Sequence, residues 1–434
     1  MSRNQITPQN LPETLVWYYI ICTYPIYLLG AQYVLAPILA SYLVFYLLRK
    51  WWNQTEETAP NKKITISPLI WVWLVAVLVI EFALIIGHLS FNLEIVQILK
   101  SSLNWYRSWG LFALFPLVGH LNIRPRLIYR AICILCLQSL IVVLISSLAV
   151  ILKIPIISYS SPLINFFGGV RLSYSVNLFY IYDEGEIRLN LFAPWSPILG
   201  MMGNIYFYLA LHEPSRKWRL TAMTGAVSMI FASVSRAGML CFPLVLVLPW
   251  LLTNFLRPWV QFILGFMSML LGMIAPTLIN LLQSVKDDIL DARAGSSKVR
   301  DVLYRLAVEK WWKEAPIWGH GRLEEHGPAF AAHLPIGSHH TWFGILYSHG
   351  IVGFVSLAVA FSCSVIYLLI KAPNNTYAQM GLIILVIILL FSFAENIEGS
   401  AYTYWPALLF LGIAYKESSS SDEKFSVKNI KTNC

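Results

Sequence analysis

The chain has 434 residues, of which 57% are hydrophobic and only 12% are charged, with a mean hydropathy of +0.64. A soluble globular domain carries about 25% charged residues, so this composition excludes an ordinary soluble protein and indicates one that spans a membrane. The formal net charge is +9. In a chain this apolar we assign the excess lysine and arginine to cytoplasmic loops, and we do not expect nucleic acid as a partner.

Twelve apolar segments are candidates for crossing a bilayer, which takes about 20 residues in a helix. Their approximate bounds are 13–30, 32–48, 66–88, 104–121, 131–152, 191–211, 220–235, 237–253, 259–282, 341–370, 380–396 and 401–415. We therefore predict an all-α integral membrane protein with about twelve transmembrane helices, in which residues 1–434 form a single polytopic membrane domain.

Basic residues determine the predicted orientation, because loops rich in lysine and arginine remain in the cytoplasm. With both termini inside, the inner loops hold Arg49, Lys50, Lys62, Lys63, Arg124, Arg126, Arg130, Arg216, Lys217, Arg219, Arg257 and Lys371. The two long loops, at about 153–190 and 283–340, then face outward. The second is predicted to be a large helical periplasmic loop between spans nine and ten that carries part of the active site. Residues 416–434 are predicted to form a polar, disordered cytoplasmic tail.

The stretch from Thr221 to Leu252 contains a single charged residue, Arg236. As one helix it would be about 48 Å long, against a hydrocarbon core of about 30 Å. We therefore predict two helices with a turn near Arg236. An arginine inside lipid is costly, so this side chain is expected to face a polar cavity. An interfacial arginine whose stem lies along the membrane is the alternative.

Residues 296–313, SSKVRDVLYRLAVEKWWK, have the periodicity of an amphipathic helix within the large outer loop. We expect this helix to lie along the outer membrane surface. Asp301 and Arg305 are four positions apart and are expected to pair. The apolar face consists of Val299, Leu303, Leu306, Ala307 and Trp311.

Two arginines of the outer loops are candidates for holding an anion. Arg300 has no acid at its facing positions, which include Tyr304, and a guanidinium fork suits phosphate. A solvated surface arginine is the alternative reading of Arg300. Arg188 precedes an apolar span, but Asp183 and Glu184 lie close enough in sequence to neutralise it.

Five histidines lie close together in the outer loop, and the last two stand at the start of an apolar helix. No two of them have the H-x-x-x-H or H-E-x-x-H spacing that places two imidazoles on one helical face, so no metal or other cofactor is expected. A histidine at this position can act as a base or cap the helix. The five are His320, His326, His333, His339 and His340.

Arginines near a membrane surface can stabilise a leaving diphosphate, and a histidine can take a proton from an attacking hydroxyl. The chain has no G-x-S-x-G and no Walker A sequence. These observations favour group transfer from a lipid-linked diphosphate donor. Composition and spacing do not identify the group as a sugar.

The residues around His339 resemble the O-antigen ligase and O-antigen polymerase superfamily of bacterial membrane glycosyltransferases. Ligases of that family carry His, then Asn, Ser or Gln, nine residues, Gly, two residues, and Gly, Thr or Tyr. Here His339 and His340 are followed by nine residues, Gly350, two residues and Gly353. The spacing matches throughout, and His340 departs from the residue types at the second position.

Three further stretches resemble the same family in the same order. SVSRAGML is similar to its S-x-S-R-x-G segment and supplies Arg236, and residues 296–321 resemble its arginine-bearing helix, with Arg300 as the arginine. EIRLNLFAPWSP is similar to an arginine-bearing stretch before a span, but it lacks the usual Pro-Asn pair, so Arg188 matches less closely.

The resemblance implies a metal-independent, inverting transfer of glycan from an undecaprenyl-diphosphate-linked donor to a glycan or lipid acceptor. The reaction would take place at the periplasmic face of the bacterial inner membrane, where membrane lipids are further partners. On this reading the catalytic residues are His339, Arg300 and Arg236, and the substrate-binding residues are Arg188, His340 and Tyr304. His349, within the following helix, is expected to be packed or hydrogen-bonded.

Two alternatives remain open at this level. A ligase moves finished glycan onto a lipid core, whereas a polymerase of O-antigen or exopolysaccharide units extends a lipid-linked chain, and the motifs do not separate them. A transporter or flippase of polyprenyl-linked sugars would be expected to have interrupted helices in repeated halves and ionisable residues near the midplane. Glu81 is the only acid well inside a predicted span, so an enzyme is favoured.

Overall fold

The computed structural model describes the backbone of residues 6–55, 57, 63–183, 185–254, 257–292, 294–323, 327, 335–337 and 340–432. Within these ranges, the side chains at 183, 253, 278–292, 294–298, 300 and 420–432 are outside the description. Helix accounts for 74% of the structure.

The helices occur in chain order with few long connections. They are α1 (Leu11–Ile21), α2 (Thr23–Leu28), α3 (Gln32–Trp52), α4 (Pro68–Ser90), α5 (Ile95–Arg107), α6 (Trp109–Val118), α7 (Pro125–Ile151), α8 (Leu163–Phe167), α9 (Ser196–Leu211), α10 (Arg216–Ala232), α11 (Arg236–Asn254), α12 (Pro258–Ala292), α13 (Ala294–Glu314), α14 (Thr341–Lys371), α15 (Thr376–Ser392) and α16 (Trp405–Thr432), with 3-10 turns η2 (Arg171–Tyr174) and η4 (Glu398–Ser400).

The predicted membrane-protein architecture is confirmed in its broad form. Within the described residues, 5 helices are long and apolar enough to cross a membrane: α3, α4, α7, α14 and the Pro258–Thr277 part of α12. Shorter apolar helices include α6, α9, α15 and the Arg236–Leu252 part of α11. The number of twelve spans stays a prediction.

Two of the predicted spans are each divided into two helices. Segment 13–30 breaks at Cys22, between α1 and α2. Pro25 explains this break, because proline has no N–H to donate and its ring clashes with the carbonyl four residues earlier. Segment 104–121 breaks at Ser108, where ψ is −88°. There the buried Arg107 turns back and donates to the carbonyl of Phe167 at 2.8 Å.

The stretch from Thr221 to Leu252 forms two helices, as predicted. α10 ends at Ala232 and α11 begins at Arg236. Between them Val234 has φ +50°, and the Ser235 hydroxyl accepts a hydrogen bond from Gly238 N at 3.1 Å. The serine thus satisfies one of the free N–H groups at the start of α11.

The outer loop at 153–190 departs from the all-α prediction, because it contains two short antiparallel strand pairs. β1 (Ile157–Ser160) pairs with β2 (Ser175–Leu178), and β3 (Ile181–Asp183) pairs with β4 (Glu186–Arg188). Pairing satisfies backbone groups of the loop that lie outside its short helix α8 and its 3-10 turn η2. β4 leads directly into the segment before α9.

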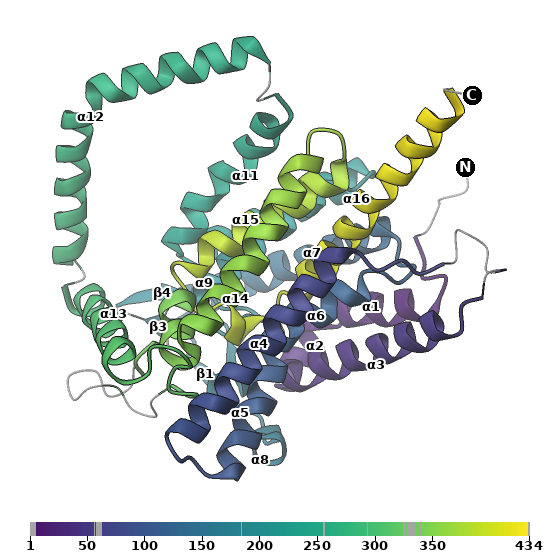
Figure 1. Cartoon of the computed structure of the whole chain (residues 1–434). Helices are drawn as coiled ribbons and strands as arrows, with labels where there is room; N and C mark the ends of the chain where they lie inside the picture. Colours follow the sequence, from purple (N-terminus) through teal and green to yellow (C-terminus); the bar gives the residue numbers. More distant parts are fainter. Residues whose placement is uncertain are drawn as a thin grey trace.

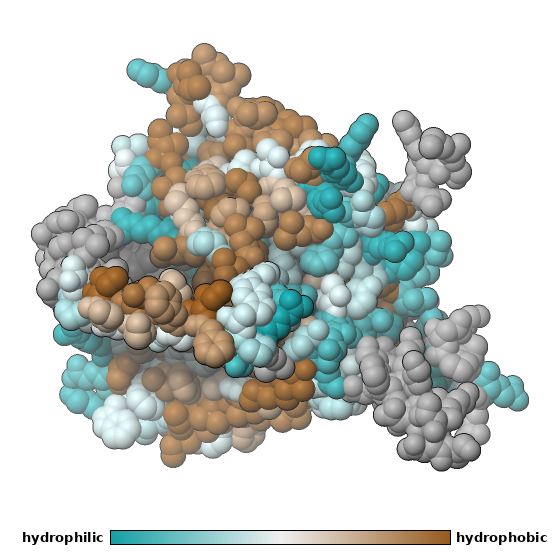
Figure 2. All heavy atoms as spheres, turned by 90° about the horizontal axis from the view of Figure 1, so that it is seen from above, coloured by the Kyte–Doolittle hydropathy of each residue, from teal (hydrophilic) through white to brown (hydrophobic). Residues whose placement is uncertain are grey.

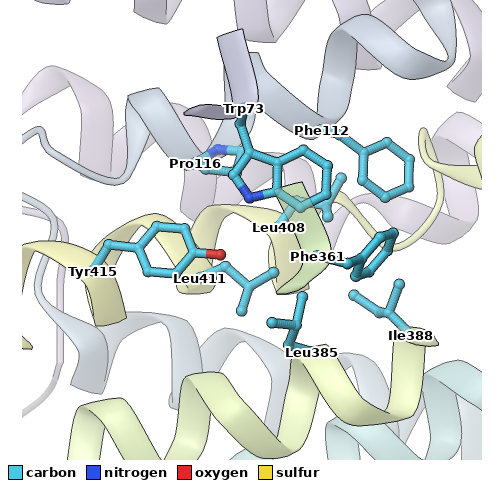
Figure 3. Close-up of a pocket in the computed structure, with 9 residues that line it drawn as sticks. All are labelled: Trp73, Phe112, Pro116, Phe361, Leu385, Ile388, Leu408, Leu411 and Tyr415. Atoms are coloured by element: carbon cyan, nitrogen blue, oxygen red, sulfur yellow. The ribbon is translucent and has the colours of Figure 1, made fainter. Parts of the chain in front are cut away.

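Aromatic rings fill the interior between α4, α6, α14 and α16. Figure 3 shows Trp73 and Phe112 beside Phe361, with Tyr415 opposite. The Trp73 indole donates to the hydroxyl of Ser364 at 2.9 Å, which satisfies its one polar atom. The cavity left among these rings has a volume of about 10 Å³, so this part of the protein is a packed core and holds no substrate.

The outside of the bundle is apolar, as a surface in contact with lipid must be. Figure 2 shows broad areas of hydrophobic side chains on the face seen from above. Large side chains on several helices are strongly exposed, among them Phe45 (65%), Leu144 (63%) and Phe262 (80%). α12 lies apart from the other helices (Figure 1), and nearly all of residues 261–277 are exposed.

The α14 helix is broken at Gly350, whose φ of 63° and ψ of −165° are not helical. The preceding loop bonds to the broken turn from both sides. His320 N and Gly321 N donate to the carbonyls of Tyr347 and Ser348 at 3.0 and 2.8 Å. In return, Ile351 N donates to the carbonyl of Pro316 at 3.0 Å.

Loop and helix approach each other so closely that only glycine fits. A Cβ on Gly350 would collide with the carbonyl oxygen of Ile317, and one on Gly319 would collide with the amide of Gly350. Both glycines also have positive φ. The glycine positions of the motif therefore have a structural role, which is to let residues 315–321 attach to α14.

α13 packs against α14 through the apolar face predicted from the sequence. Leu303 and Ala307 are buried with Tyr347 of α14, and Val299 and Leu306 pack against them. The predicted pair Arg305–Asp301 forms at 2.8 Å. The amphipathic pattern predicts a helix that lies on the membrane surface. In the structure, the apolar face of α13 packs against α14 instead.

α16 continues to Thr432. Its backbone is thus helical over residues that the sequence assigns to a disordered tail, although their side chains from 420 onward lie outside the description. The division into a membrane domain, an outer loop and a tail stays a prediction.

Replacing Gly350 by alanine tests the attachment of the loop to α14. A left-handed conformation costs a non-glycine residue about 1–2 kcal/mol, and overpacking adds about 1–3 kcal/mol. We expect Gly350→Ala to lower the thermal unfolding midpoint of the detergent-purified protein by several degrees. Gly265→Ala is the matched control, because a Cβ there meets open space. Equal midpoints for the two variants would contradict the structural role of Gly350.

Candidate functional site

The start of α14 is held by a histidine cap. The ring Nδ1 of His340 accepts hydrogen bonds from Trp342 N at 3.1 Å and from Phe343 N at 3.4 Å. An accepting Nδ1 requires the tautomer with the proton on Nε2. Asparagine and serine cap helices in the same way. His340 therefore does what an amide or hydroxyl would do at the second position of the motif, and its departure from the pattern conserves the cap.

Aromatic rings from α13 cover this helix start. The Tyr304 ring lies 5.3 Å from the His340 ring and stacks on Phe343 at 5.1 Å. Beside them is an open groove with a volume of about 550 Å³. Its lining combines aromatic with charged side chains: Asp301, Tyr304, Arg305, Val308, Glu309, Trp312 and Phe343. The structure thus brings together two of the predicted substrate-binding residues, His340 and Tyr304, at the edge of a groove.

The loop between α15 and α16 meets the same helix start from the other side. The hydroxyl of Thr341 donates to the carbonyl of Glu395 at 2.8 Å and accepts from Ile397 N at 3.0 Å. It also lies 3.3 Å from the Glu398 carboxylate. Burial raises the pKa of Glu398 to about 7, so this carboxyl can exchange a proton near neutral pH.

Glu395 connects this loop to the start of α9. Its carboxylate accepts a hydrogen bond from the Trp195 indole at 3.0 Å. Trp195 ends the segment that follows β4, and Leu189 N of that segment donates to the carbonyl of Ala232 at 3.0 Å. The beginnings of α9 and α14 and the end of α10 are therefore linked.

Two predicted arginines are close in sequence to the bond between Leu189 and Ala232. Arg188 directly precedes Leu189, and Arg236 follows Ala232 by four positions. Arg188 is buried and pairs with Glu186 at 3.1 Å. An acid therefore does pair with Arg188, and among the described side chains it is Glu186; Glu184 and the side chain of Asp183, the acids expected from the sequence, lie outside the described residues. The side chain of Arg236, at the first position of α11, is exposed.

Two of the predicted catalytic groups cannot be placed. His339 and the side chain of Arg300 lie outside the described residues. The backbone of Arg300 belongs to α13, one position before the groove residue Asp301 and four before Tyr304. His339 directly precedes the cap of α14. Their roles stay predictions.

Two further histidines that the structure describes in this region, His320 and His349, have structural partners. His320 Nδ1 lies 3.1 Å from the Tyr347 carbonyl and Nε2 lies 2.9 Å from the Glu314 carboxylate, while its ring stacks on Tyr347 at 4.2 Å. His349 is buried, with Nδ1 2.7 Å from the Ser348 hydroxyl. This confirms the expectation that His349 is packed and hydrogen-bonded.

No group of three or more possible metal ligands occurs among the residues that the structure describes. His326, His333 and His339 lie outside them. His320 already lies within bonding distance of a backbone carbonyl and a carboxylate.

Sequence reasoning missed Glu395 and Glu398. Both follow the apolar run of α15 in the sequence FAENIEGS, at and just after the end of the predicted span 380–396. Two acids this close to the end of an apolar helix could have been recognised as candidates from the sequence. Their contact with Thr341 could not have been predicted, because it joins positions that are 54 and 57 residues apart.

Comparison with known proteins identifies the segment that contains most of this site. Residues 220–358 match the family model described as O-antigen ligase. They include Arg236, Arg300, the histidine pair and Gly350. No curated protein matches the chain. Over residues 220–358 the chain is therefore similar to the O-antigen ligase family, and its apolar helices indicate a multi-pass membrane protein.

The helix cap predicts a specific acid sensitivity. Burial lowers the pKa of His340 from 6.5 to about 4, so the folded protein holds it neutral where the unfolded chain would protonate it. Its contribution to stability is complete above about pH 6.5 and falls as the pH drops toward 4, by up to about 3 kcal/mol.

His340→Asn keeps an acceptor for the cap but cannot titrate. We expect its unfolding midpoint to fall less than that of the parent protein between pH 7 and pH 4.5, whereas His340→Ala should be less stable at both, by about 1 kcal/mol. Parallel pH profiles for the parent protein and His340→Asn would show that folding does not lower the pKa of His340.

Proposed function

We propose, from the match of residues 220–358 to the O-antigen ligase family model, that this chain transfers a glycan from undecaprenyl diphosphate to an acceptor hydroxyl. Glycosyl transfer of the O-antigen ligase or polymerase type is supported by the family match itself. The lipid-linked donor, the inverting course and the absence of a metal requirement are the proposed details. We place the reaction at the periplasmic face of the bacterial inner membrane.

One observation carries the proposal. The match over residues 220–358 spans three of the positions at which a donor diphosphate and a base are expected, Arg236, Arg300 and His339. The contacts of Tyr304, His340 and Thr341 support it, because they bring α13, α14 and the α15–α16 loop together at an open groove. A groove with exposed aromatic rings and carboxylates suits a polyhydroxylated ligand.

The proposed roles follow from the chemistry of the side chains. Arg300 and Arg236 hold the diphosphate and stabilise the charge that develops on it as the glycosidic bond breaks. His339 accepts the proton of the attacking hydroxyl. Because the arginines supply the positive charge, no divalent metal is needed. Arg188, paired with Glu186, has the weakest claim to contact substrate.

A ligase and a polymerase differ in the acceptor and not in this chemistry. The structure favours neither, and lipopolysaccharide or exopolysaccharide synthesis are both consistent with the proposal. A transporter or flippase is the second candidate. The acids Glu395 and Glu398 follow α15 and contact Thr341 at the start of α14, and they do not lie at midspan, which supports the enzyme.

Separating donor binding from transfer tests the roles of the arginines and the histidine. We expect Arg300→Ala to weaken binding of the undecaprenyl-diphosphate-linked donor, and Arg300→Lys to remain impaired because lysine lacks the fork. Loss of such a stabiliser costs about 10²–10³ in rate. His339→Ala should lose about 10²–10⁴ in transfer and keep donor binding. Arg216→Ala is the control, since Arg216 is exposed at the start of α10 and does not line the groove.

The reverse pattern, with His339→Ala failing to bind donor and Arg300→Ala binding normally, would exchange the two roles. Normal transfer by His339→Ala would leave that residue no part in the chemistry. Donor transport without any transfer would favour the flippase.

Accessibility of introduced cysteines tests the orientation. A cysteine replacing Ser296, at the start of α13, should react in intact cells with a maleimide that does not cross the inner membrane. Ser215→Cys, beside the basic start of α10, is the matched control and should react only after the membrane is permeabilised. If Ser296→Cys behaved like Ser215→Cys, the proposed periplasmic site would be excluded.

A further inference from the structure

A second cavity lies away from the helix starts, between α2, α7 and the loop that contains β2. Its volume is about 410 Å³, within the range of sites for small organic ligands. The walls are mainly apolar, and Leu191 is the one lining residue from the segment between β4 and α9. The lining consists of Tyr24, Tyr27, Leu28, Gln138, Ile141, Val142, Ile145, Ser146, Asn177, Leu178, Phe179 and Leu191.

The rim of the cavity belongs to the lipid-facing surface. Ile141 and Ile145 of α7 are 49% and 51% exposed, and Leu28 of α2 is 43% exposed. α7 is one of the helices long enough to cross the membrane, so its exposed apolar side chains contact lipid. A molecule that enters between them comes from the bilayer and has an apolar body.

Two polar groups in the wall lack partners. The side-chain oxygen of Gln138 and the hydroxyl of Ser146 are buried with no hydrogen-bond partner in the described part of the chain. The Gln138 amide nitrogen, in contrast, donates to the carbonyl of Ile21 at 3.0 Å. A buried oxygen without a partner is costly in an apolar wall, and a bound O–H or N–H group would satisfy it.

The wall is also strained on the side opposite α7. Phe179 and Leu191 have φ of 72° and 50°, in the left-handed region that side chains other than glycine rarely adopt. Strained residues of this kind persist only where the surrounding structure fixes them, and they concentrate at ligand sites. Strain and unpartnered oxygens thus occur in the same cavity.

We propose that this cavity binds the hydrocarbon chain of a membrane lipid that carries a hydroxyl or amide hydrogen-bond donor, which bonds to Gln138 and Ser146. The site is independent of the proposed glycosyl transfer, and it shares with that region only the segment around Leu191. The apolar walls hold the chain, and the two oxygens select lipids with a donor over plain chains.

Photocrosslinking of the purified full-length protein tests this site. The probe is hexadecanol with a diazirine in mid-chain, and its methyl ether is the matched probe without a donor. We expect adducts on peptides containing residues 138–146 and 177–179, with the alcohol labelling about three to ten times more than the ether because the ether lacks one hydrogen bond. Ser146→Ala should reduce this preference.

Closing the rim provides the second arm of the test. Ile145→Trp places a large ring across the opening at a half-exposed position and should reduce labelling at least tenfold. Leu148→Trp is the control, because Leu148 is 56% exposed on the same helix and does not line the cavity. Unchanged labelling in Ile145→Trp, or adducts spread evenly over other lipid-facing helices, would overturn the proposal. Equal labelling by alcohol and ether would remove the selectivity assigned to Gln138 and Ser146.

Discussion

The break in α14 at Gly350 is the constraint on which the candidate site depends. Backbone groups in a membrane must find partners within the protein, since lipid offers none. The backbone groups freed by the break in α14 bond to residues 316–321, whose amides and carbonyls reach both sides of the break. The bonded loop follows α13 directly, so it fixes where α13 reaches α14. Tyr304 lies beside His340 because of hydrogen bonds made well away from either ring.

The sequence predicted those parts of the site that depend on local spacing. The amphipathic pattern of 296–313 identified the packed face of α13, and the single charge in 221–252 indicated two helices. The spacing from His339 to Gly353 indicated a family motif but not its physical basis. That basis is a cap at His340 and close backbone contact at Gly350, which become visible only when the loop and the helix are seen together.

Contacts between distant segments account for most of what the sequence did not predict. Thr341 is an ordinary first residue of a helix until Glu395 and Glu398 are brought to it from the end of α15. The break before Pro25 could have been read from the proline alone. The break at Ser108 could not, because buried Arg107 is bonded to a carbonyl 60 residues further along the chain. Periodicity carries no information on such a partner.

The isolation of α12 affects how the protein responds to its membrane. A transmembrane helix with no packing partners can tilt to match its hydrophobic length to the bilayer, whereas a packed helix cannot do so without disturbing its neighbours. α14 is packed against α4 and α13, whereas nearly all of the described side chains in the 261–277 part of α12 are exposed. We therefore expect this part of α12 to adjust to variation in bilayer thickness more readily than α14, whose contacts with α13 would keep their geometry.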